Sequence, residues 1–570
     1  MAQQSNLGYI NQAIDTLQDK LIKVIKQEAI ALPRINNVPV TILFLSIGNP
    51  KIRARVYKVI DIHLDRAIKK VRQRAAHLVQ NNHLNPEWVK IDLVTHIEKI
   101  PFQTLEKQLA KTRRNYFRSG IAFDGEFGLA FLEQEINGNA MVRSENKSPL
   151  RLNEKNINHY LKSNINHTLP FLRKRYMDKD VYTFQTKAVF LDRVETEAHE
   201  LQTGELVNGV RKTLDIEREV ESLIKNSTHF LASQVQPNGK FAYGYFSAFG
   251  KRINTYNILR HSSSLYAMAE GYELIQDESI IKQVKKGIDY AIKEAMVYQD
   301  DKTAFMVDYA NNKEIKLGSN ATAILAMAKY MEVTQTKDYL KEAQALARGI
   351  IKMKTISGGF IHVLSYPSFE IEALHRIIYY EGEAVFALLR LYAIDKQPEW
   401  LVESQKSIDY FIKNDYWKHH DHWLSYAANE ITDYLPEDKY FTFGLQNCQG
   451  RLDFIYHRDT TYPTFLELTM AAYKLIKKIK DLDKTYLLND IDEAFLTETI
   501  DHRAEYQRVG YFYPEVAMYM KNPDLILHGF FIRHHSLRVR IDDVEHYLSG
   551  YAQYLQYRVP DLIKKSGESN

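Results

Sequence analysis

The feature that most limits how this sequence can fold is a repeated helical segment in its second half. Four similar apolar segments, LYAMAEGY, ILAMAKYM, VFALLRLY and LTMAAYKL, centre near residues 268, 327, 388 and 471. The first two intervals are about 60 residues, the length of two helices with a turn and a short strand. Repeats of this kind form stacked or circular arrays of helical hairpins.

The pattern of predicted secondary structure changes near residue 215. Before that point, residues 1–30 and 64–80 show helical periodicity, whereas Val40–Leu45 and Trp88–Ile97 read as strands. After it, helical periods dominate. The sequence therefore predicts an N-terminal α+β domain over residues 1–205. An all-α toroid of the (α/α)6 type is expected over 216–560, and a disordered tail over 561–570.

Composition excludes several classes of protein. Lysine and arginine exceed aspartate and glutamate by 75 − 71 = 4, so the whole chain offers no electrostatic case for binding nucleic acid. The one cysteine, Cys448, excludes an internal disulfide and a cysteine-only zinc site, and it reads as an ordinary buried thiol. With 37 tyrosines among 570 residues, the chain suits half-buried aromatic walls such as those that hold sugar rings. A compositional bias toward Tyr, Asn, Lys and Ile explains the tyrosines equally well.

The sequence shows no targeting or membrane segment. Its start is amphipathic and lacks the apolar core of a secretory signal. The most apolar short run, Val38–Ile47, is shorter than the roughly 20 residues that span a bilayer. We therefore expect no membrane span and a cytoplasmic location. The oligomeric state is not indicated.

Two turns carry a resemblance to a known architecture. They are Gln236-Pro237-Asn238-Gly239 and Ser357-Gly358-Gly359-Phe360, each lying between a helix and a short aromatic strand. Over about residues 216–560 the pattern resembles the six-hairpin toroid of carbohydrate-active enzymes. This architecture is shared by glycoside hydrolases, unsaturated-uronide hydrolases, N-acylglucosamine 2-epimerase-like enzymes and glucuronyl C5-epimerases. No motif diagnostic of one family is found, so the resemblance implies an architecture and not a reaction.

In such a toroid, polar groups at the starts of the inner helices converge on a central cavity. Helix starts also favour anions, because their N–H groups are free. Candidate catalytic residues on this basis are Glu381, Glu383, Tyr426, Glu430, His457 and Asp459. Candidate substrate-binding residues are Arg260, His261, Tyr380, Arg458, Arg533, His534, Arg538, Arg540 and Asp542.

These residue types support two chemistries. Glycoside hydrolysis needs one protonated and one ionised carboxylate. Uronate epimerisation or elimination needs a base such as Tyr or His, beside a cation that stabilises the enolate. The structural alternative is that the carboxylates cap helices and that the run His457-Arg458-Asp459 forms a buried ion network.

The segment Gly529–His546 is the most unusual. Read as a strand, it places His534, Arg538, Arg540 and Asp542 on one face. Two guanidinium groups on one face could clamp a carboxylate or phosphate. The alternative is internal pairing of the arginines with aspartates.

Other motifs are absent or weak. The run His419-His420-Asp421-His422 could bind a metal, but adjacent residues rarely point at one ion and no H-E-x-x-H spacing supports it. No P-loop, dinucleotide-binding or nucleophile-elbow motif is present. We therefore expect neither a metal nor a cofactor.

The sequence thus favours an enzyme that acts on a saccharide, with an anionic saccharide among the candidates, without separating hydrolysis from epimerisation or elimination. The main alternative is a non-catalytic toroid that binds a polymer or a protein. A transferase of cell-envelope polymer synthesis is a third option that rests on no motif.

Overall fold

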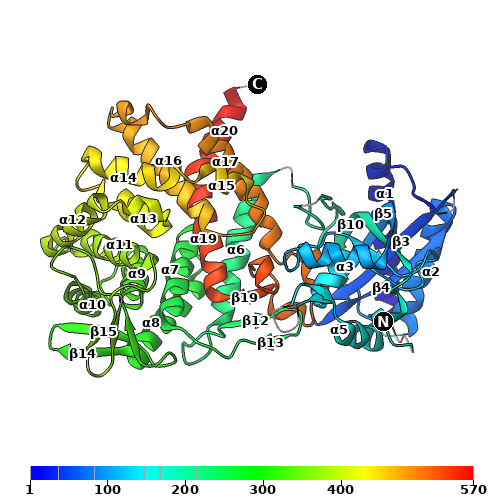
Figure 1. Ribbon diagram of the computed structural model, residues 1–570, viewed down its shortest axis with the longest axis horizontal. Coiled ribbons are helices and arrows are strands. Elements are labelled where there is room, and N and C mark those ends of the chain that lie inside the picture. The colour runs from blue at the N-terminus through cyan, green and yellow to red at the C-terminus, as the bar shows by residue number, and fades with distance from the viewer. Residues whose placement is uncertain are drawn as a thin grey trace. The chain divides into compact units, whose positions relative to one another are not determined.

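The computed structural model describes residues 2–35, 37–81, 84–144, 148–165, 169–204, 206–213 and 215–568 (Figure 1). The chain forms two compact units. The first unit comprises residues 1–214, 245–252 and 508–539; the second, here called the ring unit, comprises 215–244, 253–507 and 540–570. The sequence predicted a single boundary between 205 and 216. Two later segments return to the first unit, and the second of them buries Met518 and Tyr519 in a core cluster of that unit.

The first unit is built on a seven-stranded sheet. Its strand order is β4 (Ile52–Asp61), β3 (Thr41–Asn49), β5 (Trp88–Pro101), β10 (Asp180–Asp192), β6 (Gly120–Ala122) and β7 (Ala130–Phe131), with β11 (His199–Glu200) beside β10. Its neighbouring strands pair in antiparallel orientation throughout the described residues.

Strand alternation explains why both faces of this sheet are covered. Leu43, Leu45 and Ile47 of β3 pack against the helices α1 (Ala2–Gln27) and α2 (Leu64–Asn81). The intervening Ile42 and Phe44 join a second cluster with Phe184, Met518 and Tyr519. A period of two thus sends successive side chains to opposite cores.

Shorter elements complete the first unit. They are the helices α3 (Phe102–Lys111), α4 (Glu133–Gly138), α5 (Glu154–Tyr160) and α18 (Pro514–Ala517), and the strands β1 (Arg34–Ile35), β2 (Val38–Pro39), β8 (Val142–Arg143), β9 (Arg151–Leu152) and β13 (Lys251–Arg252).

The ring unit is a closed circle of six inner helices. They are α7 (Ile258–Ile275), α9 (Leu317–Thr334), α11 (Tyr379–Asp395), α13 (His422–Ile431), α16 (Thr464–Asp481) and α19 (Ile541–Gln553). Each packs against the next, and α19 packs against α7, so the circle closes. The predicted ring of helical hairpins is confirmed.

Six outer helices surround the inner ones. They are α6 (Ile216–Gln234), α8 (Glu278–Ala295), α10 (Leu340–Lys352), α12 (Pro398–Lys413), α14 (Asp438–Gln449) and α17 (Glu493–Gln507). The difference between the layers follows from composition. In α9 every residue from Leu317 to Met331 is buried, as expected of a helix that is apolar or small on all sides. The outer helix α8 buries only one stripe.

Short strands link the hairpins. The strands β14 (Met296–Asp300), β15 (Thr303–Asp308), β16 (Glu314–Lys316), β17 (Val363–Ser365) and β18 (Ile371–Ala373) form one sheet. The remaining short elements of the chain are β12 (Gly244–Phe246), β19 (Arg538–Arg540) and α15 (Leu452–His457).

The C-terminal segment corrects one expectation. A helix, α20 (Val559–Glu568), occupies most of the predicted disordered tail. It is anchored by Asp561, which lies 2.9 Å from Lys477 on α16. Residues 569 and 570 lie outside the described residues. Among the described helices, none combines the length and the apolar composition that a membrane crossing requires.

Candidate active site

Three inner helices bring His422, Glu467 and His546 together inside the ring. His422 is the first residue of α13, Glu467 lies in the first turn of α16, and His546 lies in the second turn of α19. His546 Nδ1 is 3.0 Å from Glu467 Oε2, and His422 Nε2 is 3.9 Å from the same oxygen. The two imidazole centroids are 5.2 Å apart. Glu467 thus bonds to His546 and lies beside His422.

The other oxygen of Glu467 is also held. Tyr426 of α13 donates its hydroxyl proton to Glu467 Oε1 at 2.9 Å, and Gln553 Nε2 donates to the Tyr426 hydroxyl at 2.7 Å. Glu467 is fully buried. A buried carboxylate with a partner on each oxygen is a fixed support for the imidazole beside it.

The two histidines have opposite proton affinities. Burial alone would lower the pKa of His546, but the carboxylates of Glu545 and Glu467 outweigh burial and raise it to about 10. Burial, together with the nearby charge of His546, holds the pKa of His422 well below its usual value. At neutral pH, His546 is therefore a proton donor and His422 a proton acceptor, the division of roles that acid–base catalysis needs.

Two buried carboxyl groups adjoin this pair. Burial, reinforced by the charges of Asp421 and Glu545, raises the pKa of Glu383 to about 8. Burial likewise raises the pKa of Glu545 to about 8, although His546 opposes the shift. The Glu545 carboxylate accepts a hydrogen bond from Ser263 at 2.9 Å. Both groups can carry a proton at neutral pH.

Glycine makes room for Glu383. A Cβ atom on Gly318, in the first turn of α9, would collide with Glu383 Oε2. Gly318 therefore allows the starts of α9 and α11 to enclose the carboxyl group.

The arginines predicted to bind substrate are engaged by aspartates. Arg260 Nε lies 3.1 Å from Asp542 Oδ2, and Arg540 lies 3.0 Å from the same oxygen and 2.9 Å from Asp543. Arg260 also donates to the Tyr243 hydroxyl at 2.8 Å. Of the two readings that the sequence left open for Arg540, the structure shows internal pairing.

The predicted strand over residues 529–546 is not continuous. A 3-10 turn occupies Arg533–His535, the strand β19 has three residues, and α19 begins at Ile541. The break occurs because Ser536 and Leu537 adopt positive φ angles of 67° and 53°, which ends the alternation. Arg533, His534 and Arg538 belong to the first unit, whereas Arg540 and Asp542 belong to the ring unit.

The first-unit residues among the predicted set have contacts of their own. Arg533 is buried, and its carbonyl accepts a hydrogen bond from Asn115 at 2.8 Å. The His534 and His535 rings are 4.4 Å apart, and Arg538 lies 3.4 Å from His535 Nδ1.

The predicted residues around 457–459 lie away from the histidine pair. His457 is 69% exposed at its side chain and lies 3.4 Å from Asp453 on the same helix. Arg458 donates to Thr460 at 2.9 Å, and the carbonyl of Asp459 accepts from Tyr506.

Other predicted residues are packed in the ring. His261 is fully buried between the Tyr256 hydroxyl and the carbonyl of Gly287, and burial lowers its pKa to about 4. The Tyr380 ring lies 5.5 Å from the His362 ring, and burial raises the pKa of its hydroxyl. Glu430 pairs with Arg390 at 3.1 Å near the end of α13.

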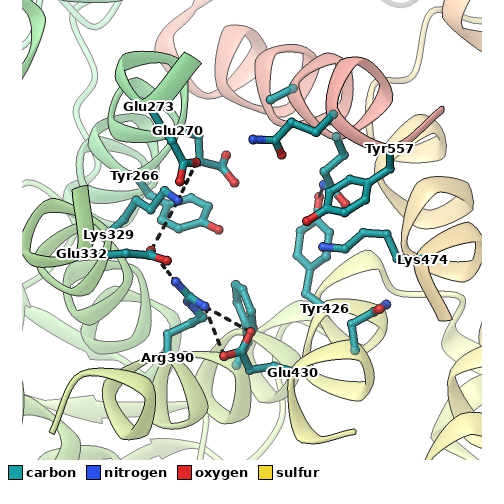
Figure 2. Close-up of a pocket in the computed structure, with 15 residues that line it drawn as sticks. Tyr266, Glu270, Glu273, Lys329, Glu332, Arg390, Tyr426, Glu430, Lys474 and Tyr557 are labelled. Carbon is teal, nitrogen blue, oxygen red and sulfur yellow. Dashed lines mark hydrogen bonds and ion pairs between the residues drawn. The ribbon is translucent and has the colours of Figure 1, made fainter. Parts of the chain in front are cut away.

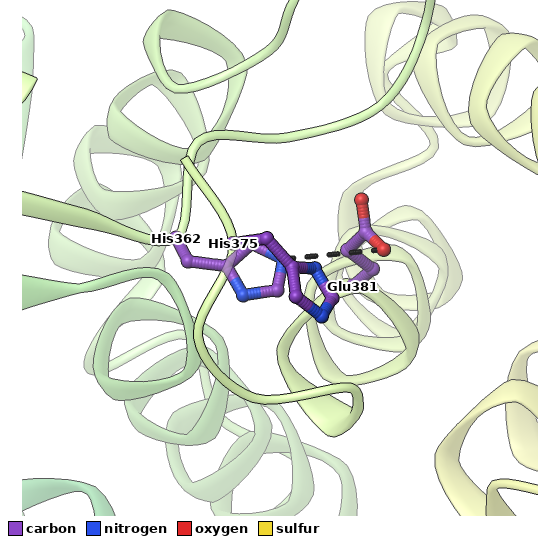
Figure 3. A group of neighbouring side chains, drawn as sticks. All are labelled: His362, His375 and Glu381. Carbon is purple, nitrogen blue, oxygen red and sulfur yellow. Dashed lines mark ion pairs between the residues drawn. The ribbon is translucent and has the colours of Figure 1, made fainter. Parts of the chain in front are cut away.

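Glu381 belongs to a possible metal-binding group with His362 and His375 (Figure 3). His362 Nδ1 accepts hydrogen bonds from the backbone N–H groups of Arg376 and Ile377 at 3.0 and 3.2 Å. A neutral imidazole held in this way carries its proton on Nε2, the atom that faces Glu381 at 3.9 Å. Metal ligation through Nε2 would require losing that proton, so this group fits a metal poorly.

A second possible group is His422, Glu467 and His546 themselves. Here the short contact between His546 and Glu467 is an N–H to carboxylate hydrogen bond, which a metal ion would have to replace. The neighbouring run that the sequence flagged does not converge: Asp421 caps α13, whereas His420 Nδ1 lies 2.9 Å from the carbonyl of Asn447.

Sequence reasoning did not select Glu467, Glu545 or His546, and it considered His422 only as a metal ligand. Glu467 lies within PTFLELTM, which reads as an apolar core helix. A carboxylate one turn after Pro463 in an otherwise apolar helix is the signal that could have identified it.

Comparisons with known proteins add a partial likeness. No protein-family model matches the sequence, and a search of curated proteins also finds no match. Among solved structures, a D-mannose isomerase aligns at 11% identity and a TM-score of 0.46, over 60% of this chain and 99% of that one. A cellobiose 2-epimerase from Bacillus thermoamylovorans aligns at 13% and 0.45, over 60% and 99%. A GH76 α-mannanase from Bacteroides thetaiotaomicron aligns at 11% and 0.42, over 61% and 100%.

Proposed function

We propose that the ring unit is a carbohydrate-active enzyme of the isomerase or epimerase type. One observation carries this proposal: two facing histidines of opposite protonation state lie beside the buried carboxylate of Glu467, which bonds to His546 at 3.0 Å and lies 3.9 Å from His422. Such a convergent polar cluster disfavours the alternative of a non-catalytic binding toroid.

The pair suits proton transfer next to a sugar carbonyl. In an open-chain sugar, His422 Nε2 removes the proton from the carbon beside the carbonyl, while protonated His546 gives its proton to the carbonyl oxygen. The C–H bond breaks, an O–H bond forms and an enediol results. Protonation of the other face of the same carbon, with the new O–H proton returning to His546, gives an epimer. Protonation of the former carbonyl carbon, with the neighbouring hydroxyl losing its proton to His546, gives an isomer. Glu467 acts as a positioning residue that holds His546 protonated.

We propose a neutral sugar as substrate. An anionic substrate would need an unpaired cation, whereas Arg260 and Arg540 both pair with Asp542.

Glycoside hydrolysis is the second candidate. It is favoured by Glu383, whose pKa of about 8 suits a general acid. Hydrolysis also needs an ionised carboxylate across the scissile bond, and Asp542 is one of the predicted candidates. Asp542 is occupied by two arginines.

The test is proton exchange in D₂O. Neutral aldoses and ketoses are incubated with the protein, and NMR follows the replacement of the C2 proton by deuterium. We expect exchange with the wild type and a loss of about 10²–10⁴-fold in His422→Asn and in His546→Asn. The matched control is His229→Asn, because His229 is exposed on the outer helix α6 and lies 3.6 Å from Asp277.

Two outcomes contradict the proposal. One is the absence of exchange for every sugar with folded wild-type protein. The other is hydrolysis of aryl glycosides that survives in His422→Asn but is lost in Glu383→Gln, which would assign the site to hydrolysis. Circular dichroism confirms that each variant is folded.

A further inference from the structure

The end of the ring opposite the histidine pair contains a polar cavity of about 200 Å³, to which all six inner helices contribute (Figure 2). Along α13, Glu430 in this cavity lies eight residues after His422, which is about 12 Å of helix. The cavity is therefore distinct from the histidine pair.

One side of the cavity is an arc of alternating charges. Lys329 lies 2.8 Å from Glu273 and 3.3 Å from Glu332. Arg390 continues the arc, pairing with Glu332 and with Glu430 (Figure 2). Each of these two cations is thus neutralised by carboxylates, while carboxylate oxygens keep further lone pairs toward a ligand.

The other side offers polar atoms without partners. Lys474 Nζ makes no hydrogen bond or ion pair within the part of the chain that the structure describes. It lies 4.7 Å from the centre of the Tyr557 ring. Burial, with Lys478 nearby, lowers the pKa of Lys474 to about 8. Asn429 Oδ1 and Gln553 Oε1 are buried and have no described partner. Leaving buried polar groups unsatisfied is unfavourable, so a ligand that pairs with them gains affinity.

Aromatic rings complete the lining. Phe386 lies 5.5 Å from Tyr426 and 6.4 Å from Tyr266, measured between ring centroids. All three rings line the cavity. Apolar ring surface beside a few fixed polar groups is the usual composition of a small-molecule site.

Charge and size select the class of ligand. Four carboxylates and three cations line the cavity, so a small anion meets net repulsion and a small cation meets Lys474. The volume holds about seven waters, the scale of one sugar ring with its hydroxyls. Sugar hydroxyl groups both donate and accept hydrogen bonds. They can donate to the carboxylates and to the side-chain oxygens of Asn429 and Gln553, and they can accept from Lys474.

We propose that this cavity is a second saccharide site, which binds a neutral monosaccharide between Lys474 and the carboxylate arc. The hydroxyl of Tyr426, which borders the cavity, also donates to Glu467. The second site is thereby joined by one side chain to the support of the histidine pair.

The test is binding, measured by saturation-transfer NMR and calorimetry with D-glucose, D-mannose and D-fructose, and with phosphate and acetate as anionic probes. We expect a millimolar site for a neutral hexose in the wild type, beside any binding of the same hexose at the histidine pair, and at least a tenfold weakening of that site in Lys474→Met. The matched control is Lys477→Met on the same helix, because Lys477 pairs with Asp561 and does not line the cavity. It is expected to bind as the wild type does.

Three results overturn the proposal. Binding lost in His422→Asn but kept in Lys474→Met places the hexose at the histidine pair. Tighter binding of phosphate or acetate than of any hexose makes this an anion site. No hexose binding up to about 100 mM, a free energy near −1.4 kcal/mol, shows that the cavity is not a sugar site. If Lys474→Met fails to fold, Tyr557→Ala tests the same wall.

Discussion

The two units of this protein each bury charged side chains, but they treat them differently. In the first unit, Lys90 and Asp92 are fully buried and lie 2.8 Å apart. Tyr519 accepts from Lys90 at 3.3 Å and shares a hydrogen bond of 2.8 Å with Ser46. In the ring unit, Glu383 Oε2, Glu545 Oε1 and His422 Nε2 are buried without a described hydrogen-bond partner.

The comparison separates a structural network from a reactive one. Apart from one Asp92 oxygen, the Lys90 network is satisfied from within, and such networks fix a single packing arrangement. Groups left unsatisfied lower stability, and their pKa values shift because no partner offsets burial. Buried groups without hydrogen-bond partners thus distinguish the surroundings of the histidine pair from the Lys90 network.

The largest effect on stability is expected from Lys90→Met. Removing the cation leaves Asp92 buried without a counter-ion, which should lower the free energy of unfolding by about 3–5 kcal/mol. Urea denaturation measures the loss. The double variant Lys90→Met/Asp92→Leu should recover most of it, since no buried charge remains. A single-variant loss below about 1 kcal/mol would contradict the role given to this pair.

Gly318→Ala should have an intermediate effect. The added methyl group meets Glu383 Oε2, so the carboxyl group must move at a cost of about 1–3 kcal/mol. Thermal unfolding measures the cost. Gly8→Ala is the matched control, because no atom lies within 4 Å of a Cβ at that position. Equal effects of the two changes would show that Glu383 is not enclosed as described.

Glu383→Gln should change how stability depends on pH. The folded pKa of Glu383, about 8, exceeds its ordinary value of 4.5. Its contribution is therefore fully present below pH 4.5 and is lost as pH rises toward 8. Glutamine does not titrate, so the variant should lose less stability than the wild type between pH 5 and pH 8, by about 1 kcal/mol or more. Parallel pH profiles of the two proteins would refute the shift.

The smallest effect is expected from His457→Ala. This side chain is exposed and pairs only weakly along its own helix, so the free energy of unfolding should change by less than about 0.5 kcal/mol. Proton exchange on sugars should persist. A loss of exchange in the folded variant would restore His457 to the site that the sequence assigned it to.

Periodicity predicted the ring because the pattern of apolar and small residues in each repeat indicates which of its helices is buried. The segment around Met327 is apolar or small on all sides, and it becomes a fully surrounded inner helix. That residues 508–539 belong to the first unit could not be predicted in the same way. A local apolar pattern does not indicate in which distant core Met518 and Tyr519 are buried.

The candidate site was predicted less well than the ring. Searching helix starts was sound in principle, because His422 lies in the first turn of α13 and Glu383 directly follows the first turn of α11. The method could not rank the candidates, since an exposed side chain such as His457 and a buried one such as Glu467 look alike in sequence. Distances across the ring decide between them, and they depend on how the helices close.

The closing helix of the ring has a consequence for biogenesis. The inner helix α19, which carries Glu545 and His546, follows the other inner helices only after the excursion of 508–539. During synthesis, five inner helices emerge before the sixth can seal the circle against α7, a contact of very long sequence separation. Until α19 has left the ribosome, the ring of the nascent protein therefore stays open, and apolar faces of its helices are accessible to chaperones. The helix that closes the ring is also the one that carries His546, the acid of the proposed reaction.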